Sequence, residues 1–213
     1  MTNENLQYIN TLLFDLDGTL LDSFPVHFEV FKTTFSHFGI QLTTEKFLSS
    51  YSPNWYKTYE AFGLKKEDWK SADTIWLKEV EEKTAQLFPG VQETLLKLSE
   101  HYTLGLVTSG SKIRVDRDLK ATAINHFFKT IITGDDIKKP KPAPEGLEIA
   151  LRNLDKQPDE VIYIGDSSAD YEMAKAASVN FMGVSSEFRS LSPNHPDYNI
   201  HSITDLPGLM GLK

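Results

Sequence analysis

The hydrophobic positions of the chain form short apolar runs separated by segments with helical periodicity. Five runs are too short for helices, are rich in Leu, Ile and Val, and are bounded by Gly, Ser, Thr or Asp, as buried strands are. These runs occupy residues 11–17, 103–109, 129–136, 161–167 and 181–186. Segments with apolar residues on one helical face lie at residues 90–101, 142–154 and 169–177. This alternation predicts an α/β fold built on a doubly wound parallel sheet.

The interval after the first apolar run has a different pattern, in which no strand is convincing. From Phe24 to Phe38, phenylalanine recurs at intervals of three and four residues, which is the stripe of an amphipathic helix. Pro89 and Gly90 then mark the return to alternating strands and helices. We therefore predict two domains, an all-helical domain at residues 23–86 and a core that comprises residues 1–22 and 87–213.

The overall composition is that of an ordinary globular protein. Of the 213 residues, 40% are hydrophobic and 24% are charged, which provides enough apolar material for one sizeable core. The net charge is −8 and no stripe of Lys and Arg follows the chain, so nucleic acid is not an expected partner. Cysteine is absent, which excludes disulfides, thiolate metal ligands and a cysteine nucleophile.

Targeting signals are not evident in the sequence. The first ten residues carry no cationic stretch followed by an apolar core, and no apolar run approaches the length of a membrane span. We therefore expect a cytoplasmic protein with no membrane partner.

Two aspartates close the first apolar run, in the stretch FDLDGT. Asp15 should project from the carboxyl edge of the sheet, where a carboxylate can act as a nucleophile or a metal ligand. Asp17 points the same way, because side chains alternate along an extended chain. Gly18 permits a sharp turn, and the Thr19 hydroxyl can donate a hydrogen bond. A calcium loop is excluded because Val26 stands where its Glu ligand is expected, which leaves a simple Asp-Gly turn as the plainer alternative.

The fourth apolar run ends in a second acidic pair, Asp166 and Asp170, in the stretch GDSSAD. An Asp at the start of a helix is often only a cap. A parallel neighbouring strand would nonetheless bring these carboxylates next to Asp15 and Asp17, and such a density of negative charge requires a cation. Because His and Cys ligands are not grouped here, the oxygen-seeking ion Mg2+ is the expected one.

Two further segments offer polar groups that suit a phosphate. The stretch LVTSGS ends a strand with Thr108 and Ser109, whose hydroxyls and adjacent N–H groups can hold phosphate oxygens. The stretch KKPKPAPE places Lys139 and Lys141 in a loop stiffened by prolines. An ammonium group there can balance an acidic cluster, although a solvated lysine is the plainer alternative.

Together these motifs resemble those of the haloacid dehalogenase-like (HAD) hydrolase superfamily. The stretches DLDGT, VTSG, KPAPE and GDSSAD follow the order and spacing of that family. The inserted helical domain is similar to the alpha-helical cap of its phosphoglycolate phosphatase and β-phosphoglucomutase branch. The resemblance implies a Rossmann-like parallel sheet with a helical cap domain. It also implies an enzyme, a Mg2+-dependent phosphatase that acts on a small phosphorylated metabolite.

The resemblance assigns a role to each acidic residue. Asp15 would attack phosphorus and form an aspartyl-phosphate intermediate, while Asp17 would serve as general acid and then general base. Mg2+ would be held by the Asp15 side chain, the Asp17 carbonyl and Asp166, with Asp170 supporting these ligands. Asp17 itself favours phosphate chemistry, because the dehalogenases of the superfamily lack this second aspartate.

The resemblance also assigns the residues that bind the phosphoryl group. These are Thr108, Ser109 and Lys141, and the lysine would in addition balance the charge of the nucleophile. Lys141 is preferred to Lys139 because it directly precedes Pro-Ala-Pro, as in the family motif.

Hydrolysis competes with a β-phosphoglucomutase-like phosphoryl transfer. His27 matches a position at which mutases and some sugar phosphatases carry His, and the alternative is a residue on the polar face of the first cap helix. Thr19 stands where mutases usually have Val. The chain has no Arg before Arg114, so the cap cannot supply the guanidinium that holds a second phosphate in a mutase. Hydrolysis is therefore the preferred function. A HAD-like protein that binds without turnover is a further alternative, although no motif residue is lost.

The cap aromatics are expected to select the substrate. In the stretch NWYKTYEAF, Trp55 and Tyr56 are the candidates, whereas Phe62 is assigned to the core of the cap. The pattern does not distinguish phosphoglycolate, pyrophosphate, a sugar phosphate or a nucleotide. It is equally compatible with a monomer and with a homodimer.

Overall fold

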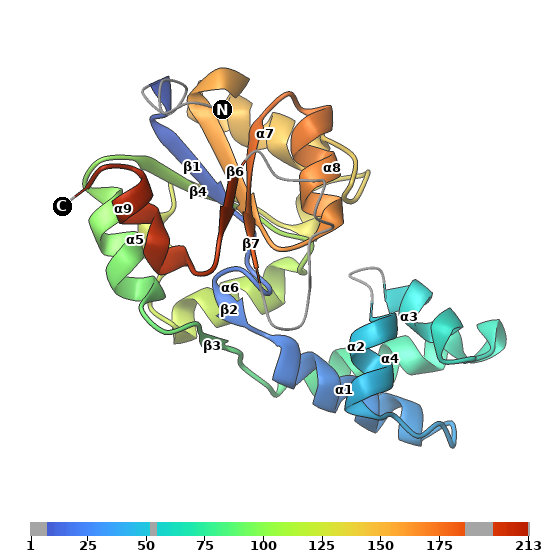
Figure 1. Cartoon of the computed structure of the whole chain (residues 1–213). Coiled ribbons are helices and arrows are strands. Elements are labelled where there is room, and N and C mark those ends of the chain that lie inside the picture. Colours follow the sequence, from blue (N-terminus) through green and yellow to red (C-terminus); the bar gives the residue numbers. More distant parts are fainter. Residues whose placement is uncertain (1–7, 52–54, 186–197, 213) are drawn as a thin grey trace. The chain divides into compact units, whose positions relative to one another are not determined.

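The computed structural model describes residues 8–51, 55–185 and 198–212 (Figure 1). The strands are β1 (Thr11–Phe14), β2 (Leu21–Asp22), β3 (Gln86–Leu87), β4 (Thr103–Val107), β5 (Thr130–Ile132), β6 (Val161–Gly165), β7 (Asn180–Val184) and β8 (Tyr198–Ile200). The α-helices are α1 (Phe24–Ser36), α2 (Thr44–Ser50), α3 (Trp55–Ala61), α4 (Trp69–Glu81), α5 (Val91–Ser99), α6 (Lys112–Ala121), α7 (Glu145–Leu154), α8 (Ser168–Ala176) and α9 (Leu206–Leu209). Short 3-10 helices are η2 (Lys66–Asp68), η3 (Asn125–Phe127), η4 (Gly134–Asp136), η5 (Pro158–Glu160) and η6 (Ile203–Asp205).

Two expectations from the sequence concern a targeting signal at the amino end and a membrane span. Residues 1–7, which belong to the segment searched for a targeting signal, lie outside the described ranges. None of the helices within those ranges combines the length and the apolar character that a membrane span requires.

Six of the strands form one sheet in the order β5-β4-β1-β6-β7-β8. All of its neighbouring strands are parallel, and Leu13 of β1 is in register with Gly105 of β4 and Tyr163 of β6. This topology confirms the predicted α/β fold with a doubly wound parallel sheet. The chain proceeds from β1 to β4 on one side and later returns to β6 on the other. The reversal makes the carboxyl end of β1 a topological switch point, where α/β folds place their ligand sites.

The hydrophobic core lies between this sheet and its helices. Alternate strand residues, among them Leu13, Val107 and Tyr163, are buried in one cluster with Leu147 of α7 and Met173 of α8. Because parallel crossovers are right-handed, the reversal of direction after β5 places α7 and α8 on one face and α5 and α6 on the other (Figure 1). The burial of both sheet faces explains why the five predicted runs are almost continuously apolar.

Three short strands were not predicted from the sequence. β2 and β3 form an antiparallel pair in which Leu21 is opposite Leu87, and β8 adds a parallel strand at the sheet edge beside β7. Strands of two or three residues are too short to show a hydrophobic period. Their existence depends on neighbouring backbone that offers hydrogen bonds rather than on the local sequence.

The chain divides into two compact units. One comprises Met1–Asp22 and Gln86–Lys213, and the other is Ser23–Ala85. The described elements of the second unit are the helices α1 to α4 and η2. Its core is largely aromatic, and α1 contributes the stripe that begins at Phe24, with Phe31 and Phe35 fully buried. Burial of this stripe against α2, α3 and α4 stabilises the unit, since each aromatic side chain removes a large apolar area from water.

Candidate active site

The candidate site lies at the carboxyl edge of the parallel sheet. Asp15 directly follows β1, Thr108 follows β4 and Asp166 follows β6. Because β1 pairs with both β4 and β6, these three residues emerge side by side from neighbouring strand ends. The chain therefore gathers residues that are far apart in sequence at the switch point of the sheet.

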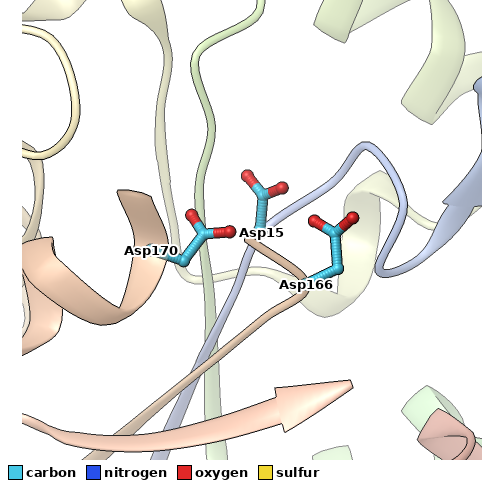
Figure 2. A group of neighbouring side chains, drawn as sticks. All are labelled: Asp15, Asp166 and Asp170. Carbon is cyan, nitrogen blue, oxygen red and sulfur yellow. The ribbon is translucent and has the colours of Figure 1, made fainter. Parts of the chain in front are cut away.

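Three carboxylates meet at this edge (Figure 2). Asp15, Asp166 and Asp170 each place a carboxylate oxygen so that the three atoms lie within 4.8 Å of one another. All three side chains are buried. Their mutual repulsion in a shielded environment is costly unless positive charge lies close to them.

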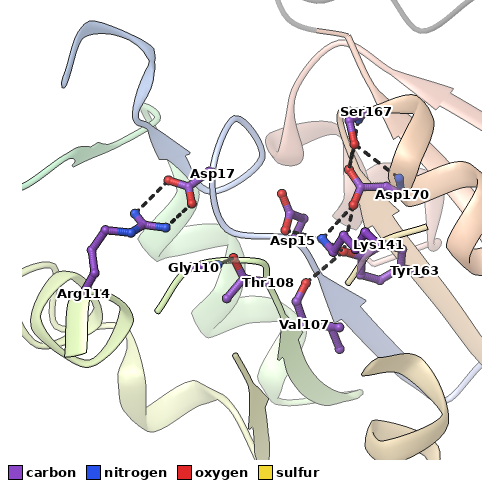
Figure 3. A network of polar contacts seen from close by, with 10 residues as sticks. All are labelled: Asp15, Asp17, Val107, Thr108, Gly110, Arg114, Lys141, Tyr163, Ser167 and Asp170. Carbon is purple, nitrogen blue, oxygen red and sulfur yellow. Dashed lines mark hydrogen bonds and ion pairs between the residues drawn. The ribbon is translucent and has the colours of Figure 1, made fainter. Parts of the chain in front are cut away.

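Lys141 supplies positive charge inside the cluster (Figure 3). Its ammonium nitrogen donates hydrogen bonds to Asp15 at 2.6 Å, to Asp170 at 2.7 Å and to the Tyr163 hydroxyl at 2.7 Å. The Tyr163 hydroxyl in turn donates to the Val107 carbonyl at 2.9 Å. The three hydrogens of the ammonium therefore have three buried acceptors, which fixes its position.

Both carboxylate oxygens of Asp170 accept hydrogen bonds. One accepts from Lys141, and the other accepts from the Ser167 backbone N–H at 3.0 Å and the Ser167 hydroxyl at 2.6 Å. Ser167 caps α8 and forms a capping box with Asp170. Asp170 therefore completes the capping box of α8 and also holds Lys141 in place.

The charges of the cluster are mutually dependent. Burial, together with the neighbouring carboxylates Asp170 and Asp166, raises the pKa of Asp15 to about 8, although Lys141 acts in the opposite direction. Burial also opposes ionisation of Asp170, but Lys141 and Ser167 outweigh it and lower the pKa of Asp170. Burial disfavours the charged form of Lys141, yet Asp15 and Asp170 outweigh this effect and raise the pKa of Lys141. One lysine is thus too little positive charge for the three carboxylates.

The turn after Asp15 requires glycine. Gly18 has a φ of +80°, which lies in the left-handed region that L-residues avoid. A Cβ atom at this position would also lie 2.8 Å from the carboxyl carbon of Asp166. The absence of a side chain at Gly18 therefore lets the loop that carries Asp17 approach the end of β6.

The donor set fits a hard divalent cation. Only carboxylate oxygens converge here, and Mg2+ binds oxygen ligands in preference to others. Because both oxygens of Asp170 already accept hydrogen bonds, Asp15 and Asp166 are the better side-chain ligands. The assignment of Asp15 and Asp166 as ligands, with Asp170 in support, stays a prediction.

The carboxylate of Asp17 does not join this cluster. It forms an ion pair with Arg114 of α6, with one hydrogen bond of 3.0 Å from Nη1 and a shorter one from Nη2 (Figure 3). The side chain of Asp17 is therefore paired with α6, and the assignment of its backbone carbonyl as a Mg2+ ligand stays a prediction.

The two hydroxyl residues after β4 differ in exposure. Thr108 is buried, its hydroxyl accepts a hydrogen bond from the Gly110 N–H at 3.3 Å, and its own N–H donates to the Ile132 carbonyl. Ser109 is exposed. Their assignment as phosphate ligands stays a prediction.

The remaining candidates belong to the helical unit. His27 is only 8% exposed and its Nδ1 lies 2.8 Å from the Tyr51 hydroxyl, so its placement on a polar helix face is wrong. Trp55 packs against Trp76 with ring centroids 5.1 Å apart. Tyr56 donates a hydrogen bond to Asp73 at 2.9 Å and is 39% exposed. Phe62 is buried in the core of this unit, as the sequence indicated.

Sequence analysis missed two residues of the site. Tyr163 was included only as part of an apolar run, and Arg114 was noted only as the first arginine of the chain. A signal for Tyr163 was available, because it is the one residue with a hydroxyl in the strand VIYIG. No local signal pointed to Arg114, whose partner lies 97 residues away.

The fold and the acidic cluster match a known class of enzymes. The chain belongs to the haloacid dehalogenase-like hydrolases, whose family profile matches residues 12–184. It is 33% identical to the pyrophosphatase PpaX of Bacillus velezensis over 211 residues, which cover 96% of this chain and 98% of the relative. A haloacid dehalogenase-like family hydrolase from Streptococcus pneumoniae has a TM-score of 0.82 and 26% identity, covering 95% of this chain and 98% of that chain. A predicted phosphoglycolate phosphatase from Haemophilus somnus shares the fold, with a TM-score of 0.83, 21% identity and the same coverage.

Proposed function

We propose that the protein is a Mg2+-dependent phosphatase that hydrolyses a small phosphorylated metabolite through an aspartyl-phosphate intermediate. The observation that carries the proposal is the contact between Asp15 and the Lys141 ammonium, inside a cluster of buried carboxylates at the switch point of the sheet. A buried carboxylate with a fixed cation beside it has the setting of a nucleophile that attacks a negatively charged phosphate.

In the first step, an oxygen of Asp15 attacks phosphorus and the bond between phosphorus and the leaving oxygen breaks. The carboxyl group of Asp17 gives its proton to the leaving oxygen, so that the leaving group departs with that oxygen protonated. The Lys141 ammonium stays beside Asp15 and offsets the negative charge that gathers around the phosphoryl group.

In the second step, water attacks the phosphorus of the aspartyl-phosphate. The Asp17 carboxylate takes a proton from this water, and the bond between phosphorus and Asp15 breaks. Inorganic phosphate is released, the Asp15 carboxylate is regenerated and Asp17 is again protonated. The cycle therefore balances with water as the only co-substrate.

Mg2+ at Asp15, the Asp17 carbonyl and Asp166 would supply the charge neutralisation that lets an anionic nucleophile approach an anionic substrate. The Thr19 hydroxyl also supports phosphate binding. It is buried, and within the described ranges it has no hydrogen-bond partner. A buried hydroxyl without a partner is costly, so a phosphate oxygen that accepted from it would be bound favourably.

Inorganic pyrophosphate is the first substrate that we propose for this site. The relative PpaX of Bacillus velezensis, which matches almost the whole chain, is named a pyrophosphatase. Phosphoglycolate is the second choice, because the likeness to a predicted phosphoglycolate phosphatase concerns the fold alone.

The test is phosphate release from pyrophosphate, phosphoglycolate, sugar phosphates and nucleotides, in Mg2+ and in EDTA. Asp15→Asn should abolish release, and Asp159→Asn, an exposed aspartate of η5, is the matched control. We expect release that requires Mg2+, is lost in Asp15→Asn and persists in Asp159→Asn. Release that survived in Asp15→Asn would refute the aspartyl-phosphate mechanism, and release that was indifferent to EDTA would refute the metal requirement.

A further inference from the structure

Arg114 binds the carboxylate of Asp17 through two hydrogen bonds. Arg114 reaches both of its oxygens, through Nη1 at 3.0 Å and through a shorter contact of Nη2 (Figure 3). Bidentate pairs between a guanidinium and a carboxylate fix the plane of the carboxylate as well as its distance. These two hydrogen bonds restrict the side-chain torsions of Asp17 far more than a single hydrogen bond would.

Arg114 is itself anchored to its helix. Its Nη1 lies 3.3 Å from Asp118, one turn further along α6, and the Asp118 side chain is only 1% exposed. Arg117 donates a second pair of hydrogen bonds to Asp118, at 3.0 Å and 2.8 Å. These ion pairs join Asp17, Arg114, Arg117 and Asp118 in one network, in which the Arg114 and Asp118 side chains are buried.

The loop before α6 leaves room for the arginine. A Cβ atom at Gly110 would collide with the guanidinium of Arg114 and would lie 3.0 Å from Val115. The Arg114 side chain is only 9% exposed, so it passes through the structure rather than over its surface. The Arg114 side chain therefore reaches Asp17 from α6 through a packed part of the structure and does not extend through solvent.

We propose that Arg114, anchored by Asp118, is the positioning residue of the acid/base group Asp17. This inference rests on the proposed function, in which Asp17 protonates the leaving oxygen. The position of Asp17 matters because a misplacement of about 1 Å of a reacting group can cost about 10²-fold in rate. A rigid helix that holds the carboxylate through Arg114 limits such misplacement.

Asp118 is the second carboxylate that Arg114 contacts, and it explains how Arg114 can hold Asp17 while Asp17 transfers a proton. When one oxygen of Asp17 turns toward a leaving group, Arg114 keeps the other oxygen of Asp17 and its contact with Asp118. The guanidinium therefore remains in place during the step, and Asp17 returns to the same position afterwards. Arg114 is a positioning residue in this account, because it touches neither substrate nor phosphorus.

The experiment compares two aryl esters that differ in their need for a proton. Phenyl phosphate releases a poor leaving group that requires protonation, whereas 2,4-dinitrophenyl phosphate releases a stable anion that does not. The parameter kcat/KM reports the step in which this group departs. Arg114→Met should lower kcat/KM about 10²-fold for phenyl phosphate, and only about threefold for the dinitrophenyl ester. Asp118→Asn should also lower kcat/KM more for phenyl phosphate than for the dinitrophenyl ester, but by a smaller factor. Arg114→Lys should retain part of the activity on phenyl phosphate that Arg114→Met loses.

A double-mutant cycle separates positioning from general damage. If Arg114 acts through Asp17, then Asp17→Asn combined with Arg114→Met should be no slower on phenyl phosphate than Asp17→Asn alone. Arg152→Met, which removes an exposed arginine of α7, is the matched control and should leave both esters unaffected. Circular dichroism of each variant confirms that it is folded.

Several outcomes would overturn the inference. An equal loss for both esters would make Arg114 a purely structural residue, and additive losses in the double mutant would uncouple it from Asp17. A faster reaction of Arg114→Met with phenyl phosphate would mean that the ion pair restrains Asp17 instead of presenting it. Esterase activity that Asp15→Asn retained, or its absence from the wild-type enzyme, would refute the phosphatase proposal itself and this inference with it.

Discussion

The ammonium nitrogen of Lys141 lies 2.6 Å from a carboxylate oxygen of Asp15, and both side chains are at least nine-tenths buried. The two residues are 126 positions apart in the sequence and meet where β1 ends. This ion pair joins the proposed nucleophile to its electrostatic support.

Removal of the ammonium should abolish most of the activity. Lys141→Met removes the ammonium that binds both Asp15 and Asp170, and we expect kcat/KM to fall by about 10²- to 10³-fold, as for loss of a preorganised donor in other active sites. Lys139→Met, in the same loop, is the matched control because that side chain is exposed. Equal losses in the two variants would contradict a specific role for Lys141.

The hydroxyl of Tyr163 should contribute to both stability and activity. Tyr163→Phe removes an acceptor of Lys141 and leaves the Val107 carbonyl without its donor. An unsatisfied buried group costs about 1–3 kcal/mol, and this loss should appear in urea unfolding. Activity should fall about tenfold if the ammonium moves, since misplaced charge weakens transition-state stabilisation. Tyr102→Phe, at the amino end of β4, is the control and should retain full activity.

A methyl group at Gly18 should disable the site without unfolding the protein. Gly18→Ala would bring a Cβ atom against Asp166 and would strain a backbone with a φ of +80°. Gly39→Ala separates the two effects, because Gly39 has a φ of +70° while no described atom lies within 4 Å of a Cβ built there. We expect both variants to lose about 1 kcal/mol of unfolding free energy from backbone strain. Only Gly18→Ala should lose phosphatase activity, and a similar activity in both would count against close packing of the turn on Asp166.

Mg2+ should raise the thermal stability of the protein through the acidic cluster. A ligand that binds only the folded state stabilises it by about 2.7 kcal/mol at a concentration one hundred times its dissociation constant. Differential scanning fluorimetry should show a higher Tm in Mg2+ than in EDTA. Asp166→Asn should remove this difference, whereas Asp159→Asn should preserve it. A Tm increase that persisted in Asp166→Asn would place the ion elsewhere.

Asp136 should make the stability depend on pH in the acid range. Hydrogen bonds from the Thr133 hydroxyl and the Thr133 backbone N–H lower the pKa of Asp136 below its ordinary value of 3.8. The contribution of ionised Asp136 to the free energy of unfolding is therefore present above about pH 4. It is lost as the pH falls through the lowered pKa that Asp136 has in the folded state. Urea unfolding between pH 5 and pH 2 should show a shallower loss of stability in Asp136→Asn than in the wild type. Parallel curves for the two proteins would contradict this assignment.

The pattern of apolar runs and motifs was enough to predict the parallel sheet and the convergence of Asp15, Asp166 and Asp170 at its edge, but not the pairing of Asp17 with Arg114. Burial of both sheet faces demands continuous apolar strands, and the right-handed connection between parallel strands leaves few topologies to choose from. Asp15 and Asp166 each end such a strand, so their convergence followed from the order of the strands. The four motifs, being local in sequence, also indicated the HAD-like hydrolases to which the chain belongs.

Only the tertiary structure decided which side chains support the proposed nucleophile and the proposed acid. Tyr163 looked like one more core residue, and its hydroxyl acquires a role because it accepts a hydrogen bond from the Lys141 ammonium. A polar helix face was the alternative place for His27, but the packing of α1 buries it beside Tyr51. The pair of Arg114 with Asp17 depends on the placement of α6 against the turn after β1. Contacts of this kind are set by packing between distant segments, so a local pattern of hydrophobic and polar residues cannot predict them.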